Sequence, residues 1–210
     1  LPVDYTIGRG DLSIIYPGLG DWTRWEENLY AAYLNYVYER KHLDIEAGLR
    51  AEQTDVIYNM PPENAYYAEN DAYDYFSLFP NIRTTWKINA NHGLSAFYNK
   101  RVDRPGEPEL RIYPKSDDPE LMKVGNPYLR PQFTQRLELA YKLNWNSGSL
   151  FLAGYHRMID DTYLRIYITD TTQADYAIVN KIYQNVGHST NTGAEVLLTQ
   201  QIEDSWKVNA

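Results

Sequence analysis

The sequence predicts an all-β fold, an antiparallel up-and-down meander of about eight strands that forms part of a larger transmembrane β-barrel. Three observations lead to this prediction: apolar and polar residues alternate, polar turns alternate with long connections, and aromatic residues gather near the turns. A membrane-crossing strand needs only about 9–11 residues, and half of its side chains face away from lipid. The mean hydropathy of -0.58 is therefore compatible with a membrane barrel.

The alternation is clearest between Phe133 and Trp145, where every second residue is large and apolar except Gln135. The intervening residues carry charges of both signs, among them Arg136 and Glu138. A period of two places these two sets on opposite faces of a β-strand. The same pattern recurs in segments 30–38, 43–51, 76–88, 94–98 and 194–202.

The connections between these segments are of two kinds. Four are short polar turns rich in Asn, Gly, Ser and charged residues, at 40–41, 89–93, 146–148 and 203–205. Three are long, at 59–74, 103–131 and 169–175. Outer-membrane barrels have short turns at the periplasmic end and long loops outside, whereas soluble sandwiches mix their connection lengths. The pattern therefore favours the barrel.

Aromatic residues lie close to the ends of the predicted strands. Trp86, Trp145, Trp206 and Tyr38 lie near short turns, and Trp22 and Trp25 lie at the other end of the first hairpin. Amphipathic rings collect at the two membrane interfaces, because one side prefers hydrocarbon and the polar group prefers water. We interpret these residues as two aromatic belts, although Trp and Tyr are also common in any strand.

The predicted organisation has two parts. Residues 1–28 form an extracellular-type loop or the end of a preceding strand, and residues 29–210 form a partial barrel of hairpins, truncated at both ends. A net charge of -8 argues against nucleic acid as a partner. With no cysteine, the chain has neither disulfides nor thiolate metal sites.

Four short motifs follow one another in the order of a known family. They are Ala47-Gly48-Leu49-Arg50-Ala51-Glu52, Tyr98-Asn99-Lys100-Arg101-Val102-Asp103-Arg104-Pro105, Gly125-Asn126-Pro127-Tyr128-Leu129-Arg130-Pro131, and Asn185 with Gly187 followed by Gly193-Ala194-Glu195. From about Leu29 onward the chain resembles the C-terminal barrel of TonB-dependent outer-membrane receptors, in the branch called the outer membrane protein β-barrel family.

This resemblance implies a location in the cell outer membrane, surrounded by lipid, and a role in binding and importing a nutrient. The nutrient would be a glycan, peptide, siderophore or cobalamin. The periplasmic protein TonB would act through an N-terminal plug that this sequence does not contain. Two alternatives stay open: a soluble all-β carbohydrate-binding module of an exported protein, and an outer-membrane barrel without TonB coupling.

Candidate functional residues fall into two groups. The first group would face the barrel lumen, because charge on the lipid side is costly: Arg50, Glu52, Arg83, Arg136, Glu138 and Glu195. The second group would bind ligand from the long loops, because loops on a rigid scaffold often carry binding: Tyr66, Tyr67, Tyr73, Arg111, Tyr113, Tyr128 and Arg130.

We expect no enzyme activity, because the sequence contains no catalytic constellation, and we expect no cofactor and no metal. The four histidines lack metal-type spacing. Two acidic loop clusters, Glu69 with Asp71 and Asp74 and Asp117 with Asp118 and Glu120, have the oxygen ligands of calcium but no EF-hand pattern. Made alone, the segment would have unpaired sheet edges and an exposed apolar face, so we expect it to self-associate.

Overall fold

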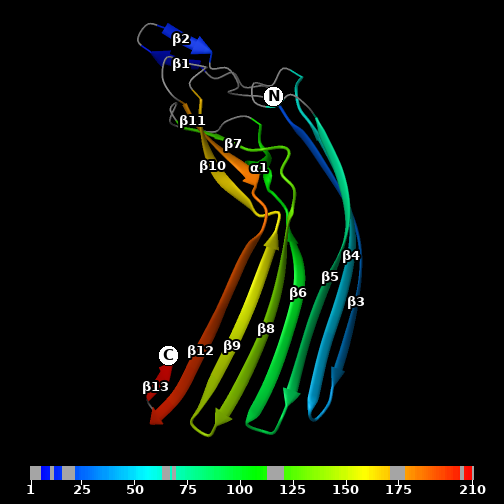
Figure 1. The fold of residues 1–210 in the computed structure, drawn as a ribbon, viewed down its shortest axis with the longest axis vertical. Helices are drawn as coiled ribbons and strands as arrows, with labels where there is room; N and C mark the ends of the chain where they lie inside the picture. Colours follow the sequence, from blue (N-terminus) through cyan, green and yellow to red (C-terminus); the bar gives the residue numbers. More distant parts are fainter. Residues whose placement is uncertain are drawn as a thin grey trace.

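The computed structural model describes residues 6–9, 12–15, 22–62, 67, 70–112, 121–170, 178–203 and 206–209 (Figure 1). An antiparallel sheet with the strand order β13-β12-β9-β8-β6-β5-β4-β3 dominates it. Its members are β3 (Arg24–Glu39), β4 (Leu43–Asn59), β5 (Asp71–Lys87), β6 (His92–Asp103), β8 (Gln132–Trp145), β9 (Gly148–Asp160), β12 (Ser189–Glu203) and β13 (Trp206–Asn209). The predicted meander of about eight strands is confirmed, and the sheet is open, with β3 and β13 at its edges.

The two kinds of connection lie at opposite ends of this sheet (Figure 1). The hairpins β3–β4, β5–β6, β8–β9 and β12–β13 turn within a few residues at one end. The connections β4–β5, β6–β8 and β9–β12 lie at the other end, and the last two contain further elements. The predicted separation of short turns from long connections is therefore confirmed.

The long connections form most of the remaining structure. The β6–β8 connection contains α1 (Glu107–Leu110) and β7 (Leu121–Val124), and the β9–β12 connection contains the hairpin β10 (Tyr163–Asp170) and β11 (Ile178–Asn185). β7 pairs with β11 in parallel, which the alternation did not predict. A separate hairpin joins β1 (Thr6–Arg9) to β2 (Leu12–Ile15). None of the described helices is long and apolar enough to cross a membrane.

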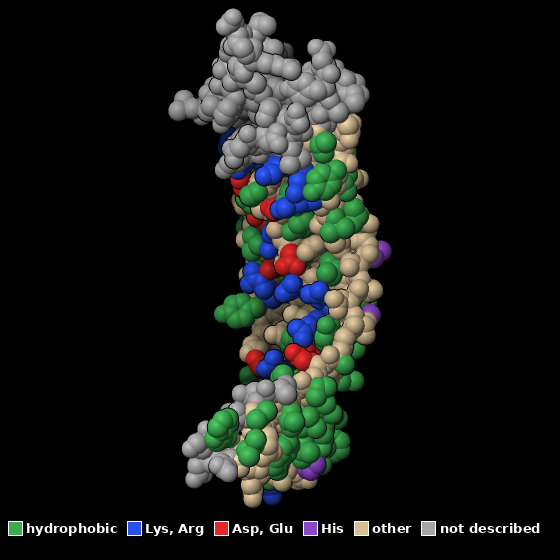
Figure 2. All heavy atoms as spheres, turned by 90° about the vertical axis from the view of Figure 1, so that its left-hand side faces the viewer, with side chains coloured by type: hydrophobic (Ala, Val, Ile, Leu, Met, Phe, Trp, Pro, Cys, Tyr) green, Lys and Arg blue, Asp and Glu red, His purple; other side chains and the backbone are tan. Residues whose placement is uncertain are grey.

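The register of the sheet separates side chains into two faces. We call the face that carries Leu137 and Leu139 the apolar face and the face that carries Arg136 and Glu138 the polar face. Leu139 is 58% exposed on the apolar face, whereas Ala140 beside it is buried on the polar face. Figure 2 shows the charged side chains gathered in a column along the molecule. The predicted alternation therefore separates the two chemistries over most of the sheet, with edge strand β3 apolar on both faces.

Three details differ from the predictions. β3 begins at Arg24, so the expected boundary between residues 28 and 29 falls inside a strand. β4 and β5 are each 17 residues long and stay paired as far as Tyr58 and Asp71, which shortens the connection predicted over 59–74. Trp25 pairs with Tyr58 on the polar face, so it does not belong to an outward-facing belt.

Phe133 also departs from the simple alternation. The β5–β6 ladder ends at Asn81 and Asn99, and the two strands diverge beyond that point (Figure 1). There the ring of Phe133 stacks on Phe79 with centroids 6.4 Å apart, and Lys100 Nζ lies 5.1 Å from the Phe133 centroid. Aromatic and cation–π contacts thus join β5 to β8 where no backbone ladder does.

Candidate functional site

All six residues predicted to face the lumen lie on the polar face. Directly paired residues of antiparallel strands have their side chains on the same face. Arg83 pairs with Phe97, and Phe97 with Glu138, so their side chains share a face. The same ladders, followed across β4, β5, β8, β9 and β12, place Arg50, Glu52, Arg136 and Glu195 on that face.

Most charges on this face have a partner of opposite sign. Arg50 is ion-paired with Glu52, and Arg136 with Glu138. Near the short turns, Lys87 Nζ lies 2.6 Å from an oxygen of Asp44. Pairing of this kind keeps charge on a strand wall without leaving buried groups unsatisfied.

Arg104 extends this network across three strands. It follows β6, and its Nη2 donates to Glu52 Oε2 on β4 at 2.5 Å. Its Nε lies 3.0 Å from Glu27 Oε1 on β3, which is an ion-pair distance. Its guanidinium also lies 6.0 Å from the ring centroid of Tyr75 on β5. Burial on its own lowers the Arg104 pKa, but the hydrogen bond and charge of Glu52 outweigh it, so the pKa is raised.

At the end with long connections, the β6–β8 connection folds over the end of β4. A small core of buried side chains joins the two: Tyr58, Met60, Leu110, Ile112 and Leu129. We call this set the loop core. The Tyr58 hydroxyl donates to the Leu110 carbonyl at 2.8 Å, so that its polar group is satisfied within the apolar cluster.

Gly125 makes the close packing of this connection possible. A Cβ at this position would lie 2.5 Å from the backbone nitrogen of Arg111 and 2.6 Å from the carbonyl oxygen of Glu109. The Gly125 nitrogen instead donates to the Arg111 carbonyl at 2.7 Å. Its own carbonyl accepts a 2.7 Å hydrogen bond from the Tyr67 hydroxyl. The glycine of the motif at 125–131 is thus required by backbone proximity.

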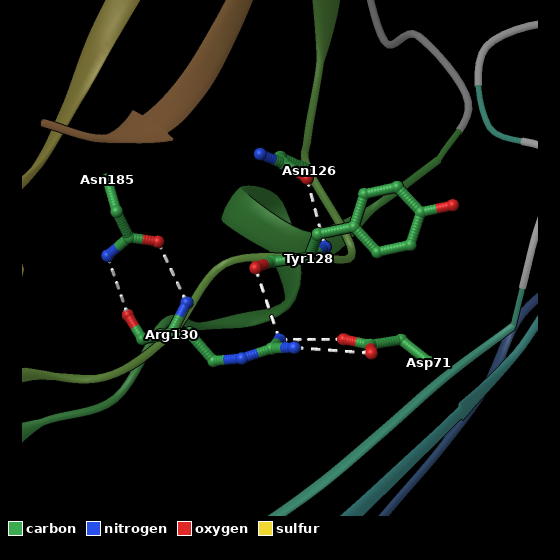
Figure 3. Close-up of polar contacts among 5 residues, drawn as sticks. All are labelled: Asp71, Asn126, Tyr128, Arg130 and Asn185. Carbon is green, nitrogen blue, oxygen red and sulfur yellow. Dashed lines mark hydrogen bonds and ion pairs between the residues drawn. The ribbon is translucent and has the colours of Figure 1, made fainter.

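Arg130 links the β6–β8 connection to the start of β5 and to the end of β11 (Figure 3). Its Nη1 donates to Asp71 Oδ2 at 2.6 Å, and its Nη2 donates to Asp71 Oδ1 at 3.2 Å. The guanidinium lies 4.2 Å from the ring centroid of Tyr73. A two-point pairing with a carboxylate fixes both orientation and distance. It attaches the entrance of β8 to the start of β5.

Asn185 binds the backbone of Arg130 at both its polar groups. Its Oδ1 accepts from the Arg130 nitrogen at 2.9 Å, and its Nδ2 donates to the Arg130 carbonyl at 3.0 Å. Nearby, Asn126 Nδ2 donates to the Tyr183 carbonyl at 3.0 Å. Together with the parallel β7–β11 pair, these bonds join the β6–β8 and β9–β12 connections into one unit.

The residues predicted to bind ligand lie in the β4–β5 connection, at the start of β5 and in the β6–β8 connection. Tyr67 and Tyr128 meet edge to face with centroids 5.4 Å apart, and Arg130 covers Tyr73. Arg111 is ion-paired with Glu107 at 2.5 Å. Tyr66 and Tyr113 lie outside the described residues. Tyr67, Tyr73, Tyr128 and Arg130 thus make contacts between segments that are distant in sequence, whereas Arg111 pairs within its own connection. Their role in binding stays a prediction.

Three residues of this unit were not predicted as functional. Asn126 and Asn185 lie in two of the four motifs of the sequence, which is the signal that marks them. Asp71, at the start of β5, belongs to one of the two acidic clusters in the sequence, and the structure pairs it with Arg130. Within the described ranges, no group of three or more acidic or histidine side chains is arranged to hold a metal. Glu69, Asp117, Asp118 and Glu120 lie outside those ranges.

Solved structures of transporters and receptors share this fold. The chain superposes on the copper transporter OprC with a TM-score of 0.62 at 15% identity, covering 95% of this chain and 30% of that one. For the Serratia marcescens hemophore receptor HasR the TM-score is 0.65 at 14% identity, covering 83% and 32%. For the Pseudomonas aeruginosa siderophore receptor PirA it is 0.59 at 10% identity, covering 89% and 42%.

The chain thus spans about 30–42% of the length of these solved structures. No curated protein matches the sequence. The model of the outer membrane protein beta-barrel family matches residues 3–210. This chain belongs to the outer membrane protein β-barrel family and forms part of a barrel in the cell outer membrane.

Proposed function

We propose that this chain is part of the wall and mouth of a TonB-dependent receptor that binds a nutrient and imports it across the outer membrane. The observation that carries the proposal is the two-faced sheet. Its apolar face carries exposed Leu137 and Leu139, while Arg83, Arg136 and Glu138 lie on the opposite face. Such a sheet fits a wall with lipid on one side and a polar lumen on the other.

The β6–β8 and β9–β12 connections, which would form the mouth of the barrel, support an uptake role. Connections that only close a barrel need no hydrophobic core. Here the loop core and the Arg130–Asp71 pair attach the β6–β8 connection to β4 and β5, and Asn185 joins it to the β9–β12 connection. A fixed arrangement lowers the entropic cost of capturing a ligand. The exposed aromatic side chains of this unit, Tyr128 and Tyr167, are then the first candidates for contact with substrate.

The class of nutrient is the finer part of the proposal. Solved structures with this fold carry names that refer to copper, siderophores and a haem-carrying hemophore. From the sequence resemblance, the candidate nutrients are glycans, peptides, siderophores and cobalamin. The receptor would perform no covalent chemistry, and its energy would come from TonB acting on a plug.

Growth and uptake measurements test this function. Deletion of the gene for the full-length protein should abolish growth on one of these nutrients supplied as the limiting source, and a wild-type copy should restore it. Cells that lack TonB should show the same loss. If uptake depends on this protein but persists without TonB, the second candidate, a barrel without TonB coupling, is correct. If deletion changes uptake of none of these nutrients, the import role is wrong.

A further inference from the structure

A hollow on the polar face brings two arginines together. It has a volume of about 350 Å³ and is lined by Arg136, Tyr155, Arg157, Ala194 and Glu195. Arg136 on β8 and Arg157 on β9 are direct cross-strand partners. Like charges in directly opposite positions of a sheet destabilise it. An oppositely charged group at this point of the wall would stabilise the pair.

The charges nearby partner only one of the two arginines. Arg136 is ion-paired with Glu138, and its guanidinium lies 5.5 Å from the ring centroid of Tyr155. For Arg157, the described residues provide no hydrogen-bond acceptor and no ion pair, and its Nε is buried without a partner. The Nε of Arg136 is likewise buried and has no hydrogen-bond partner among the described residues. Buried donors without acceptors are costly.

Glu195 lines the same hollow but makes no ion pair with Arg157 among the described residues. It pairs with Ala153, four positions before Arg157 on β9. Four residues of strand separate the two backbone positions by about 13 Å. The position opposite Arg157 on β12 is Asn191, which carries no charge.

Gly193 shapes one side of the hollow. A Cβ at Gly193 would lie 2.6 Å from the hydroxyl of Tyr155 and 2.7 Å from its ring, so only glycine lets this ring lie over β12. The Tyr155 ring in turn supports the Arg136 guanidinium. Gly193 belongs to the motif at 193–195, and its missing side chain makes room for the aromatic wall of a cationic hollow.

We propose that the Arg136–Arg157 hollow is an oxyanion site that binds a carboxylate or phosphate group. Guanidinium groups provide paired donors that match the geometry of both groups. The oxyanion has two possible sources, a small anion in solution or an acidic side chain elsewhere in the full-length protein. The site does not depend on which nutrient is imported.

The test uses the full-length receptor in detergent with inorganic phosphate as the probe. In Arg157→Met the hydrocarbon stem is kept and the charge and donors are lost. Arg157→Lys keeps the charge. Arg101→Met is the matched control, because Arg101 lies on the polar face of β6 but is exposed and already paired with Asp103 at 3.6 Å. The measurements are equilibrium dialysis with labelled phosphate and the thermal unfolding midpoint without phosphate.

If the anion comes from solution, wild type and Arg101→Met bind one more phosphate than Arg157→Met does, and Arg157→Lys keeps weakened binding. If it is an internal carboxylate, Arg157→Met lowers the unfolding midpoint by at least about 2 °C, while Arg101→Met and Arg157→Lys change it less. Either result supports the site. Without an oxyanion, removing one of two facing charges relieves repulsion, so an unchanged or raised midpoint with unchanged phosphate binding would overturn it.

Discussion

Arg130 holds Asp71 with two hydrogen bonds of 2.6 and 3.2 Å, although 59 residues of sequence separate them. The side chain of Asp71 is only 16% exposed, and the two groups join the entrance of β8 to the start of β5. The side chain of Asn185 hydrogen-bonds the backbone nitrogen and carbonyl of Arg130, which attaches Arg130 to the β9–β12 connection as well. Arg130 is the point at which the β6–β8 connection meets the start of β5 and the end of β11.

Asp71→Asn should loosen the mouth of the barrel without disturbing the wall. The amide keeps the shape of the side chain but removes its charge, so Arg130 loses its ion pair. The attachment of the β6–β8 connection to the start of β5 then weakens by about 1–3 kcal/mol. Limited proteolysis of the full-length receptor should show faster cleavage within 104–131. Asp44→Asn removes a comparable pair with Lys87 at the short-turn end and should leave this cleavage unchanged. Equal cleavage in wild type and Asp71→Asn would contradict the assigned role.

Arg104→Met should destabilise the receptor more than Arg101→Met. Glu52 has a side chain that is only 6% exposed and would keep only Arg50 as a partner. Leaving a buried carboxylate undercompensated costs about 1–3 kcal/mol, allowing for the remaining partner. Urea unfolding in detergent measures the difference. The double variant Arg104→Met with Glu52→Gln should recover part of the loss, and no recovery would show that Arg104 acts by packing alone.

Asn185→Ala should uncouple the two joined connections. The Arg130 amide proton loses its acceptor, and the Arg130 carbonyl loses its donor. Hydrogen exchange followed by mass spectrometry should show exchange in the segment 128–132 faster by about tenfold or more, which corresponds to about 1.4 kcal/mol. Asn185→Asp retains the acceptor oxygen and should give a smaller change. Protection equal to wild type in both variants would rule out Asn185 as the link.

Leu139→Arg should impair insertion into lipid. Leu139 lies midway along β8 on the apolar face and is 58% exposed. An arginine on the lipid side costs about 2–4 kcal/mol at the bilayer midplane. Folding into lipid vesicles, followed by heat-modified mobility on gels, measures the effect. Leu139→Gln tests polarity without charge and should have a smaller effect. If the arginine variant folds as well as wild type, this face does not contact lipid.

The isolated 210-residue chain should self-associate in water. β3 lies at the sheet edge with Tyr33 80% and Leu34 74% exposed, one on each face. Exposed strand edges and apolar faces promote association between chains. Static light scattering without detergent should report a mass of several chains, and detergent should reduce it. A monodisperse monomer in plain buffer would refute the expectation.

The sequence by itself determined most strands of the large sheet, their two chemical faces and the end at which the turns are short. These features are local, because a period of two alone sends Arg136 and Leu137 to opposite faces, and polar turn residues mark where the chain reverses. Local information also identified Gly125 and Gly193 as motif residues, although not their neighbours. It failed where strands diverge, as at Phe133, since alternation assumes a continuous ladder.

Only the tertiary structure decided what the side chains of the connections contact. Spacing along the chain does not indicate that Arg130 meets Asp71, that Tyr67 reaches Gly125, or that β7 pairs in parallel with β11. These partners lie far apart in sequence and approach one another only when the sheet has brought the ends of its strands together. The facing arginines Arg136 and Arg157 depend in the same way on the register between β8 and β9, which pairs residues that no local pattern relates.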